Sequence, residues 1–229
     1  MSNKTVIIIP ARKGSKRVPG KNTKLLCGKK LIEYTIEHAI NSKKADDIFI
    51  STDDDSISDI AERYNCKFLR RGEELSNDKA STGVVIDDFL ERAFVGNNRP
   101  DNIVLLQPTV PFRRKTLTDE AIELLETGEY DSVTTHIEVD FYHPNRLKKI
   151  EGQYLVPYKE KENESVNRDM LEKVYCRDGA VYAFRTESYI KTKSFLGDRQ
   201  GYLINDIETH VNIDTYKDWY VAEALIGNM

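Results

Sequence analysis

Two kinds of hydrophobic pattern alternate along this chain. Short, β-branched apolar runs are typical of buried strands, and segments with apolar residues every three or four positions are typical of helices with one buried face. The predicted strands are 5–9, 47–51, 66–70, 102–107, 132–137, 180–184 and a segment near 210–213. The predicted helices are 31–40, 56–64, 83–94, 117–126 and 216–225. This alternation predicts an α/β fold with a doubly wound, mostly parallel sheet flanked by helices.

One stretch, residues 138–175, interrupts this rhythm. It is polar, charged and rich in Tyr, Lys and Glu, with no clean alternation of strands and helices. The chain has no internal repeat, Gly/Ser linker or low-complexity tract that would mark a second independent domain. We therefore expect one α/β core made of residues 1–137 and 176–229, with residues 138–175 inserted in it as an excursion.

Composition narrows the classes of function. A length of 229 residues is enough for a substantial core. The 34 Lys and Arg nearly balance the 38 Asp and Glu, so the net charge of −4 argues against a protein that coats nucleic acid. Cys27, Cys66 and Cys176 have no metal-ligand or CxxC spacing, which favours reduced thiols. The apolar run at 6–9 is too short for a signal peptide or a membrane span. We expect a cytoplasmic protein without nucleic-acid or membrane partners.

A basic, glycine-containing loop follows the first predicted strand directly. Its sequence, IPARKGSKRVPGKN over residues 9–22, contains the charged and glycine residues Arg12, Lys13, Gly14, Lys16, Arg17, Gly20 and Lys21. In parallel α/β sheets the ligand crevice lies beyond the carboxyl ends of the strands. Glycines let successive N–H groups turn into one concavity, and the cations supply countercharge. The loop is therefore predicted to hold a polyphosphate.

Two alternatives apply to this loop. A P-loop NTPase requires four residues between its glycines and a hydroxyl after the lysine. Here five residues separate Gly14 from Gly20, and Asn22 stands in the hydroxyl position. That spacing argues against the P-loop class. A solvated basic loop without a ligand stays open as the second alternative.

Five ordered segments together resemble the acylneuraminate cytidylyltransferase family, also called CMP-sialic acid synthetases. They are IPARKGSKRVPGKN at 9–22, RGEELSNDKAST at 71–82, LQPTVPFR at 106–113, DGAVY at 178–182 and HVNIDTYKDW at 210–219. The resemblance implies a Rossmann-like fold and a CTP-dependent nucleotidyltransferase. Such an enzyme transfers CMP from CTP to the anomeric hydroxyl of an acidic nine-carbon (nonulosonic) sugar and releases pyrophosphate. The alternatives are a 3-deoxy-octulosonate cytidylyltransferase and a catalytically inert nucleotide-binding homologue.

The resemblance also implies roles for nucleotide-site residues. Lys21 and Arg12 match positions that stabilise the phosphates during catalysis, and Arg71 matches an arginine at the cytidine site. The nucleotide-binding set carried over is Ala11, Arg12, Gly14, Lys21, Asn22, Arg71, Ala80, Ser81 and Thr82. The alternatives are a turn or cap role for Asn22 and a surface ion pair for Arg71.

Sugar and metal residues follow in the same way. Gln107, at the end of a predicted strand, and Tyr182 match sugar contacts, although Tyr182 also suits a core aromatic residue. Asp214 resembles the carboxylate that binds Mg²⁺ or another divalent cation, with helix capping as its alternative. Asn212 stands where many members carry a second aspartate, so it is a weak metal ligand. No catalytic role is expected for the four histidines.

The excursion at 138–175 corresponds, in this resemblance, to a segment that reaches a neighbouring subunit. Arg146 and Arg168 match basic residues that such a segment contributes to the partner's sugar carboxylate. The chain is therefore expected to act as a homodimer.

Overall fold

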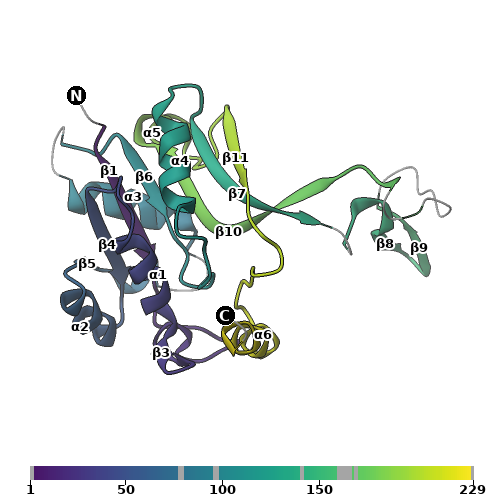
Figure 1. Cartoon of the computed structure of the whole chain (residues 1–229), viewed down its shortest axis with the longest axis horizontal. Helices are drawn as coiled ribbons and strands as arrows, with labels where there is room; N and C mark the ends of the chain where they lie inside the picture. The colour runs from purple at the N-terminus through teal and green to yellow at the C-terminus, as the bar shows by residue number, and fades with distance from the viewer. Residues whose placement is uncertain are drawn as a thin grey trace.

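A seven-stranded sheet forms the centre of the molecule. The structure is a computed structural model, and it describes residues 3–76, 80–94, 98–139, 142–158, 167 and 170–227. The strand order is β11-β7-β10-β6-β1-β4-β5 (Figure 1). The strands are β1 (Thr5–Pro10), β4 (Asp47–Thr52), β5 (Lys67–Arg70), β6 (Asn102–Leu105), β7 (Ser132–Val139), β10 (Val174–Arg185) and β11 (Gln200–Ile204). Neighbouring strands are parallel except at β10, which is antiparallel to β6 and β7. The predicted α/β class, with a mostly parallel sheet flanked by helices, is confirmed.

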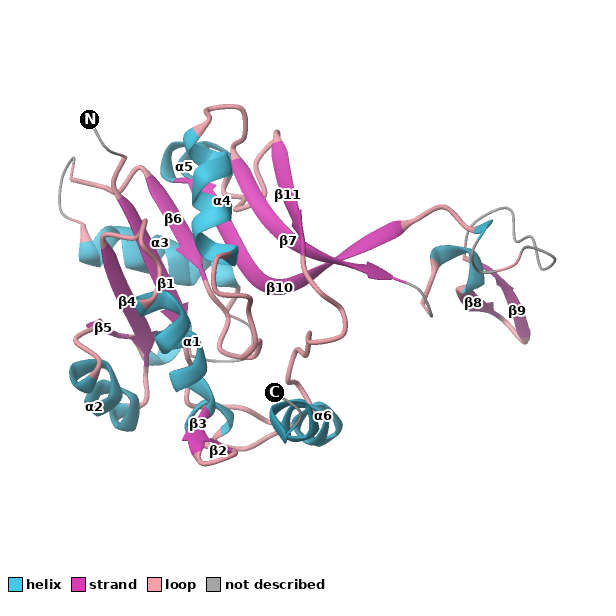
Figure 2. Ribbon diagram, viewed as in Figure 1, coloured by secondary structure: helices cyan, strands magenta, loops and turns pink. Residues whose placement is uncertain are grey.

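Helices cover both faces of this sheet. Successive side chains of a strand point to opposite faces of the sheet, so the buried residues of β1 pack alternately into the apolar core on each face. Ile7 and Ile9 pack with α1 (Leu31–Ile40), α2 (Asp55–Arg63) and α4 (Leu117–Glu126). Val6 and Ile8 pack with α3 (Thr82–Ala93) and α5 (Thr186–Thr192). Figure 2 shows α1 and α4 in front of the sheet and α3 behind it.

A third apolar cluster joins distant parts of the chain below the sheet. Trp219 and Ala222 of α6 (Tyr216–Gly227) pack with Val18, Leu26 and Leu31. This region includes the short elements η1 (Lys21–Thr23), β2 (Leu25–Leu26) and β3 (Lys29–Lys30). Figure 2 shows α6 beside β2 and β3. The basic loop is therefore held against the segment that leads into α6.

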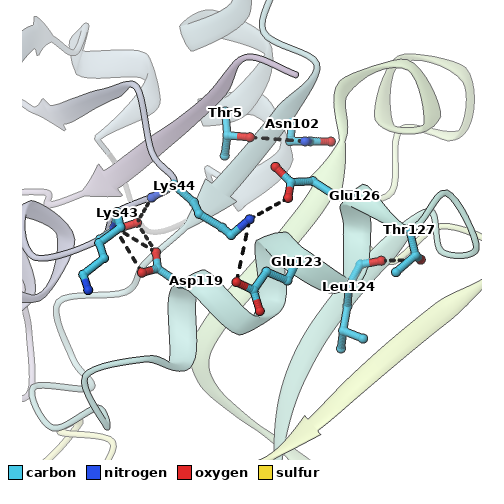
Figure 3. A network of polar contacts seen from close by, with 10 residues as sticks. Thr5, Lys43, Lys44, Asn102, Asp119, Glu123, Leu124, Glu126 and Thr127 are labelled. Atoms are coloured by element: carbon cyan, nitrogen blue, oxygen red, sulfur yellow. Dashed lines mark hydrogen bonds and ion pairs between the residues drawn. The ribbon is translucent and has the colours of Figure 1, made fainter. Parts of the chain in front are cut away.

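Polar contacts join the segment that follows α1 to α4 (Figure 3). Lys44 reaches Glu126 at 2.8 Å and Glu123 at 3.7 Å. Asp119 accepts hydrogen bonds from the Lys43 backbone N–H at 3.1 Å. Exposed pairs of this kind contribute about 0–1 kcal/mol each, so they orient the two helices more than they stabilise the fold.

Residues 142–158 lie apart from the sheet. They form η3 (Pro144–Arg146) and a hairpin of β8 (Lys148–Glu151) and β9 (Tyr154–Pro157). Figure 1 shows this hairpin beyond the sheet, with the long strands β7 and β10 running out toward it. Within the described ranges, no helix is long and apolar enough to cross a membrane.

Several elements differ from the sequence prediction, among them the short strands β2, β3, β8 and β9, which were not predicted. The strand expected near 210–213 is wrong, because Val211 and Ile213 are buried against α6 and not in the sheet. The edge strand β11 and the short helix α5 were not predicted. An apolar pattern shows that side chains are buried, but it does not identify the element against which they pack.

Candidate active site

A cleft of about 300 Å³ opens beside the carboxyl ends of β1 and β6. Parallel sheets bind ligands at this edge. The residues that line it come from four separate parts of the chain and are Pro10, Arg12, Gly14, Ser15, Lys21, Asn22, Arg71, Ala80, Thr82, Val85, Gln107, Pro108, Thr109, Asn212 and Asp214. Most residues predicted from the sequence to bind nucleotide or metal therefore lie together in this cleft. Ala11, Ser81, Tyr182 and Arg146 are not in this lining, and Arg168 lies outside the described residues.

The basic loop is fastened to β4 at its start. The Ala11 backbone N–H donates to the Ser51 carbonyl at 2.9 Å, and the Lys13 N–H donates to Asp53 Oδ1 at 2.7 Å. The side chain of Ala11 is fully buried in the core. The Ala11 backbone N–H thus anchors the loop to β4 and is not available to a ligand, and Ala11 is not in the cleft lining.

The far end of the loop is closed by Asn22 and Gly20. Asn22 Nδ2 donates to the Arg12 carbonyl at 2.9 Å, so the loop folds back on itself. Gly20 has φ +62°, a left-handed conformation that suits glycine, and it precedes η1. A Cβ on Gly14 would have no atom within 4 Å, which leaves open space beside the loop backbone.

Lys21 is a buried cation at the centre of the cleft. It is 8% exposed, and its Nζ donates to the Ile213 carbonyl at 2.6 Å and to Asp214 Oδ1 at 3.1 Å. Burial lowers the pKa of Lys21, and the hydrogen bond to Asp214 opposes this shift. The positive charges of Arg17 and Arg12 also lower the pKa. Three cations against one carboxylate give a site suited to an anionic ligand.

Asp214 does not cap the helix that follows it. The cap of α6 is a reciprocal capping box, in which Asp218 Oδ2 accepts from the Thr215 N–H at 2.8 Å and the Asp218 N–H donates to Thr215 Oγ1 at 3.4 Å. Asp218 also accepts the Asp214 N–H at 3.0 Å. This leaves the Asp214 carboxylate, which is 52% exposed, facing Lys21 in the cleft.

The oxygen donors in the cleft fit one kind of metal site. Asp214 and Asn212 both line it, and the described part of the chain has no group of three or more acidic, His or Cys side chains able to hold a metal ion. Mg²⁺ is commonly bound through one or two carboxylates together with substrate phosphates. These residues therefore fit a divalent cation that is held jointly with a phosphate ligand.

Arg71 is nearly fully buried at the side of the cleft. It is 6% exposed, and burial lowers its pKa. Its Nη2 and Nε donate to the carbonyl and hydroxyl of Ser51 at 2.9 and 3.3 Å, and Nη1 donates to the Leu75 carbonyl at 3.4 Å. Arg71 thus braces the carbonyl that also anchors the basic loop, while part of its surface faces the cleft.

The amino end of α3 forms the adjoining wall. The Ser81 hydroxyl accepts the Val84 N–H at 3.4 Å as the helix cap, so Ser81 has a structural contact of its own. Ala80 and Thr82, on either side of it, line the cleft. The positive end of the helix dipole favours an electron-rich ligand group at this wall.

Gln107 is held by an arginine that the sequence analysis did not single out. Arg113 Nη2 donates to the Gln107 carbonyl at 2.7 Å, Nε to the Ala180 carbonyl at 2.8 Å, and Nη1 to Thr35 Oγ1 at 3.0 Å. Burial lowers the pKa of Arg113 to about 9. Its only sequence signal is its place in LQPTVPFR, because two of its three hydrogen-bond partners, Ala180 and Thr35, are far away along the chain.

Tyr182 lines a second hollow, of about 700 Å³, with His136, Tyr175, Cys176, Arg177, Phe195 and Gln200. Its ring is 9% exposed and packs edge-on against Phe195 with centroids 5.4 Å apart. Tyr182 pairs with Leu105, two residues before Gln107, so the hollow and the cleft lie on adjacent strands. Arg146, in η3, belongs to the separate segment 142–158.

Comparison with known proteins identifies the relatives of this chain. The model of a family described as cytidylyltransferase matches residues 6–211. A CMP-N,N'-diacetyllegionaminic acid synthase of Legionella pneumophila is 32% identical, covering 96% of this chain and 94% of that protein. An N-acylneuraminate cytidylyltransferase of Escherichia coli is also 32% identical, over 97% of this chain but 52% of that protein. The chain thus spans about half the length of the Escherichia coli relative.

Two further proteins are similar to this chain. A pseudaminic acid cytidylyltransferase of Campylobacter jejuni is 29% identical, covering 97% of this chain and 96% of that protein. A solved structure of a CMP:2-keto-3-deoxy-manno-octonic acid synthetase, complexed with CTP, superposes with a TM-score of 0.72. It is 18% identical and covers 98% of this chain and 99% of that one, so this likeness concerns the fold.

Proposed function

This chain belongs to the cytidylyltransferase family, and we propose that it transfers CMP from CTP to the anomeric hydroxyl of a nonulosonic acid, releasing pyrophosphate. One observation carries the proposal. The cleft joins the basic loop, Arg71 and the amino end of α3 to Gln107 and Asp214, so a phosphate site and a polar acceptor site share one cavity. The relatives are named for N-acylneuraminate, N,N'-diacetyllegionaminic acid and pseudaminic acid, which supports an acidic nine-carbon sugar as the acceptor.

The nucleotide half of the cleft supplies positive charge. As the acceptor oxygen bonds to the α-phosphorus of CTP, the bond to the pyrophosphate oxygen breaks and negative charge builds on the leaving group. Lys21 and Arg12 line the cleft where preorganised cations stabilise such charge. Arg71, Ala80 and Thr82 form the wall that we assign to the cytidine. A divalent cation such as Mg²⁺, bound at Asp214 with Asn212 as a weaker ligand, would add countercharge to the phosphate oxygens.

The acceptor half lies toward β10. Gln107 presents its carboxamide at the cleft, and the hollow beneath Tyr182 offers aromatic and polar walls for the rest of the sugar. We assign Gln107 and Tyr182 to sugar binding. The sugar's anomeric hydroxyl then faces the α-phosphate at the boundary between the two halves.

We further propose that two copies of the chain share each site. The segment 142–158 carries large apolar side chains that are strongly exposed, with Ile150 at 77% and Tyr154 at 76%. A two-fold partner would cover such a surface, since these side chains are left exposed by the described residues of their own chain. Arg146 and Arg168 of one subunit would then approach the sugar carboxylate bound by the other.

The test measures pyrophosphate release with each of CTP, UTP, ATP and GTP against sialic, legionaminic, pseudaminic and 3-deoxy-octulosonic acids. We expect turnover with CTP and one of the nine-carbon acids. Preference for the eight-carbon acid would move the assignment to an octulosonate cytidylyltransferase. Tight CTP binding without turnover on any acid would instead indicate an inert homologue.

A further inference from the structure

Gly179 lies where two carboxamides meet the β10 backbone. It has φ +80°, and the register of β10 against β7 shifts between Arg177 and Tyr182. A Cβ built on Gly179 would lie 2.9 Å from Gln107 Oε1 and 3.5 Å from Asn212 Nδ2. Glycine therefore leaves room for the end of the Gln107 side chain.

The backbone on the Gly179 side of this contact is held firmly. The neighbouring Asp178 is 3% exposed, and its carboxylate accepts the Ala180 N–H at 2.9 Å, Asn205 Nδ2 at 2.9 Å and the Thr135 hydroxyl. A buried carboxylate with three hydrogen bonds is costly to move, because each lost bond leaves a buried polar group unpaired. Gly179 thus cannot retreat easily from Gln107.

The backbone on the Gln107 side is held as well. Arg113 bonds the Gln107 carbonyl and the Ala180 carbonyl at 2.7 and 2.8 Å, which ties the segment after β6 to β10 at this point. An added methyl at position 179 would therefore displace the Gln107 side chain, whose far end is flexible, and leave both backbones in place.

We propose that Gly179 is the positioning residue for the Gln107 carboxamide. The space beside the Gly179 backbone would then determine where Gln107 binds the acceptor sugar. The sugar half of this inference rests on the proposed function. The placement of Gln107 is a separate claim with its own readout. A bulkier residue at position 179 would weaken sugar binding and spare CTP, whose assigned contacts are Arg71 and the basic loop.

The experiment compares Gly179→Ala with Gly128→Ala. Gly128 has φ +85°, so alanine there meets the same backbone strain, but the nearest atom to its Cβ is Arg185 Nη2 at 4.0 Å. We expect Gly179→Ala to raise the KM for the sugar about tenfold, the scale of one ligand hydrogen bond, with the KM for CTP within about twofold of wild type. Gly128→Ala should change neither. Equal effects of both variants on the sugar KM would overturn the proposal.

A double variant tests the route through Gln107. In a Gln107→Ala background, adding Gly179→Ala should cost little more, because the displaced group is already gone. Additive losses would contradict the proposal. If Gly179→Ala alone fails to fold, recovery of folding in the double variant supports the contact, and no recovery refutes it.

A substrate-free measurement separates this inference from the proposed function. The side-chain amide resonances of Gln107, identified by their absence in Gln107→Ala, should move in Gly179→Ala and stay in place in Gly128→Ala. Unmoved resonances would overturn the positioning role even if the enzyme is active. A wild-type protein inert on every sugar, with these resonances displaced as expected, would refute the proposed function alone.

Discussion

Replacing Lys21 with methionine would remove the ammonium group from the cleft while keeping most of the aliphatic side chain. The Nζ atom has two partners, the Ile213 carbonyl at 2.6 Å and Asp214 Oδ1 at 3.1 Å. Burial lowers the pKa of Lys21, which means that keeping this ammonium group charged in the folded protein costs free energy. Such a residue suits a ligand that brings negative charge.

The structure separates the expected effects on stability and on catalysis. Asp214 is 52% exposed, so its pair with Lys21 stabilises little, and the lost bond to Ile213 is offset by relief from burying a charge. We expect the free energy of unfolding to change by no more than about 1 kcal/mol. Losing one cation that stabilises the leaving group should cost about 2–4 kcal/mol, a fall in kcat/KM of about 30- to 900-fold.

The assay is pyrophosphate release for kcat/KM, with urea unfolding on the same preparations. Lys24→Met is the matched control, because Lys24 Nζ lies 5.4 Å from the Trp219 ring and Lys24 is not in the cleft lining. It should keep activity within about twofold of wild type, because Lys24 lies outside the cleft lining. Its half-buried contact with the buried Trp219 ring bears on stability instead, where such a contact is worth about 0.5–2 kcal/mol. The reasoning fails if Lys21→Met keeps a third of the wild-type kcat/KM, or if its unfolding free energy falls by as much as its transition-state stabilisation.

Three further predictions follow from the same structure. Asp214→Ala should abolish most activity and any dependence of that activity on magnesium. Its Tm should change little, because the capping box of Thr215 and Asp218 caps α6 without Asp214. A large fall in Tm would favour a structural role for Asp214. Burial lowers the pKa of His38 from 6.5 to about 3, so the unfolded chain takes up this proton first as pH falls. The free energy of unfolding should then fall by roughly 1.4 kcal/mol per pH unit below 6.5. Urea titrations at pH 7 and pH 5 should show a smaller fall for His38→Gln than for the wild type, and equal falls would contradict this prediction. Co-expressed Lys21→Ala and Arg168→Ala chains should form hybrid dimers with about half of wild-type activity, whereas hybrids no better than either parent would remove the shared site.

Much of the cleft could be predicted because its chemistry is local in the sequence. The basic loop follows a strand directly, and strand ends at one edge of a parallel sheet must meet, so Arg12, Lys21 and Gln107 were expected together. Asp214 was expected there only from the resemblance, with capping as an alternative. The structure argues against capping by Asp214, because the neighbouring Thr215 makes the cap, and metal binding stays a prediction.

The parts that could not be predicted depend on long-range contacts without a repeating pattern. Arg113 bonds the Ala180 carbonyl 67 positions away and the Thr35 hydroxyl 78 positions away, and nothing in the sequence distinguishes these groups from others of their kind. The segment near 210–213 has the alternating apolar residues of a strand, yet Val211 and Ile213 are buried against a helix. Ala11 and Ser81 matched a motif, but their contacts serve the loop anchor and the α3 cap.

The contact between Lys21 and Asp214 also has a consequence for synthesis. These residues are 193 positions apart. At about 5–20 residues per second, a ribosome takes about 10–40 s to add the second after the first. During that interval the nascent chain can carry the basic loop and most of the sheet, but it lacks Asp214 and the apolar support of α6. A chain stalled before residue 211 therefore has the basic loop without Asn212, Asp214 and the packing of α6, so we expect it to capture nucleotide only after residues 211–227 have been made and docked.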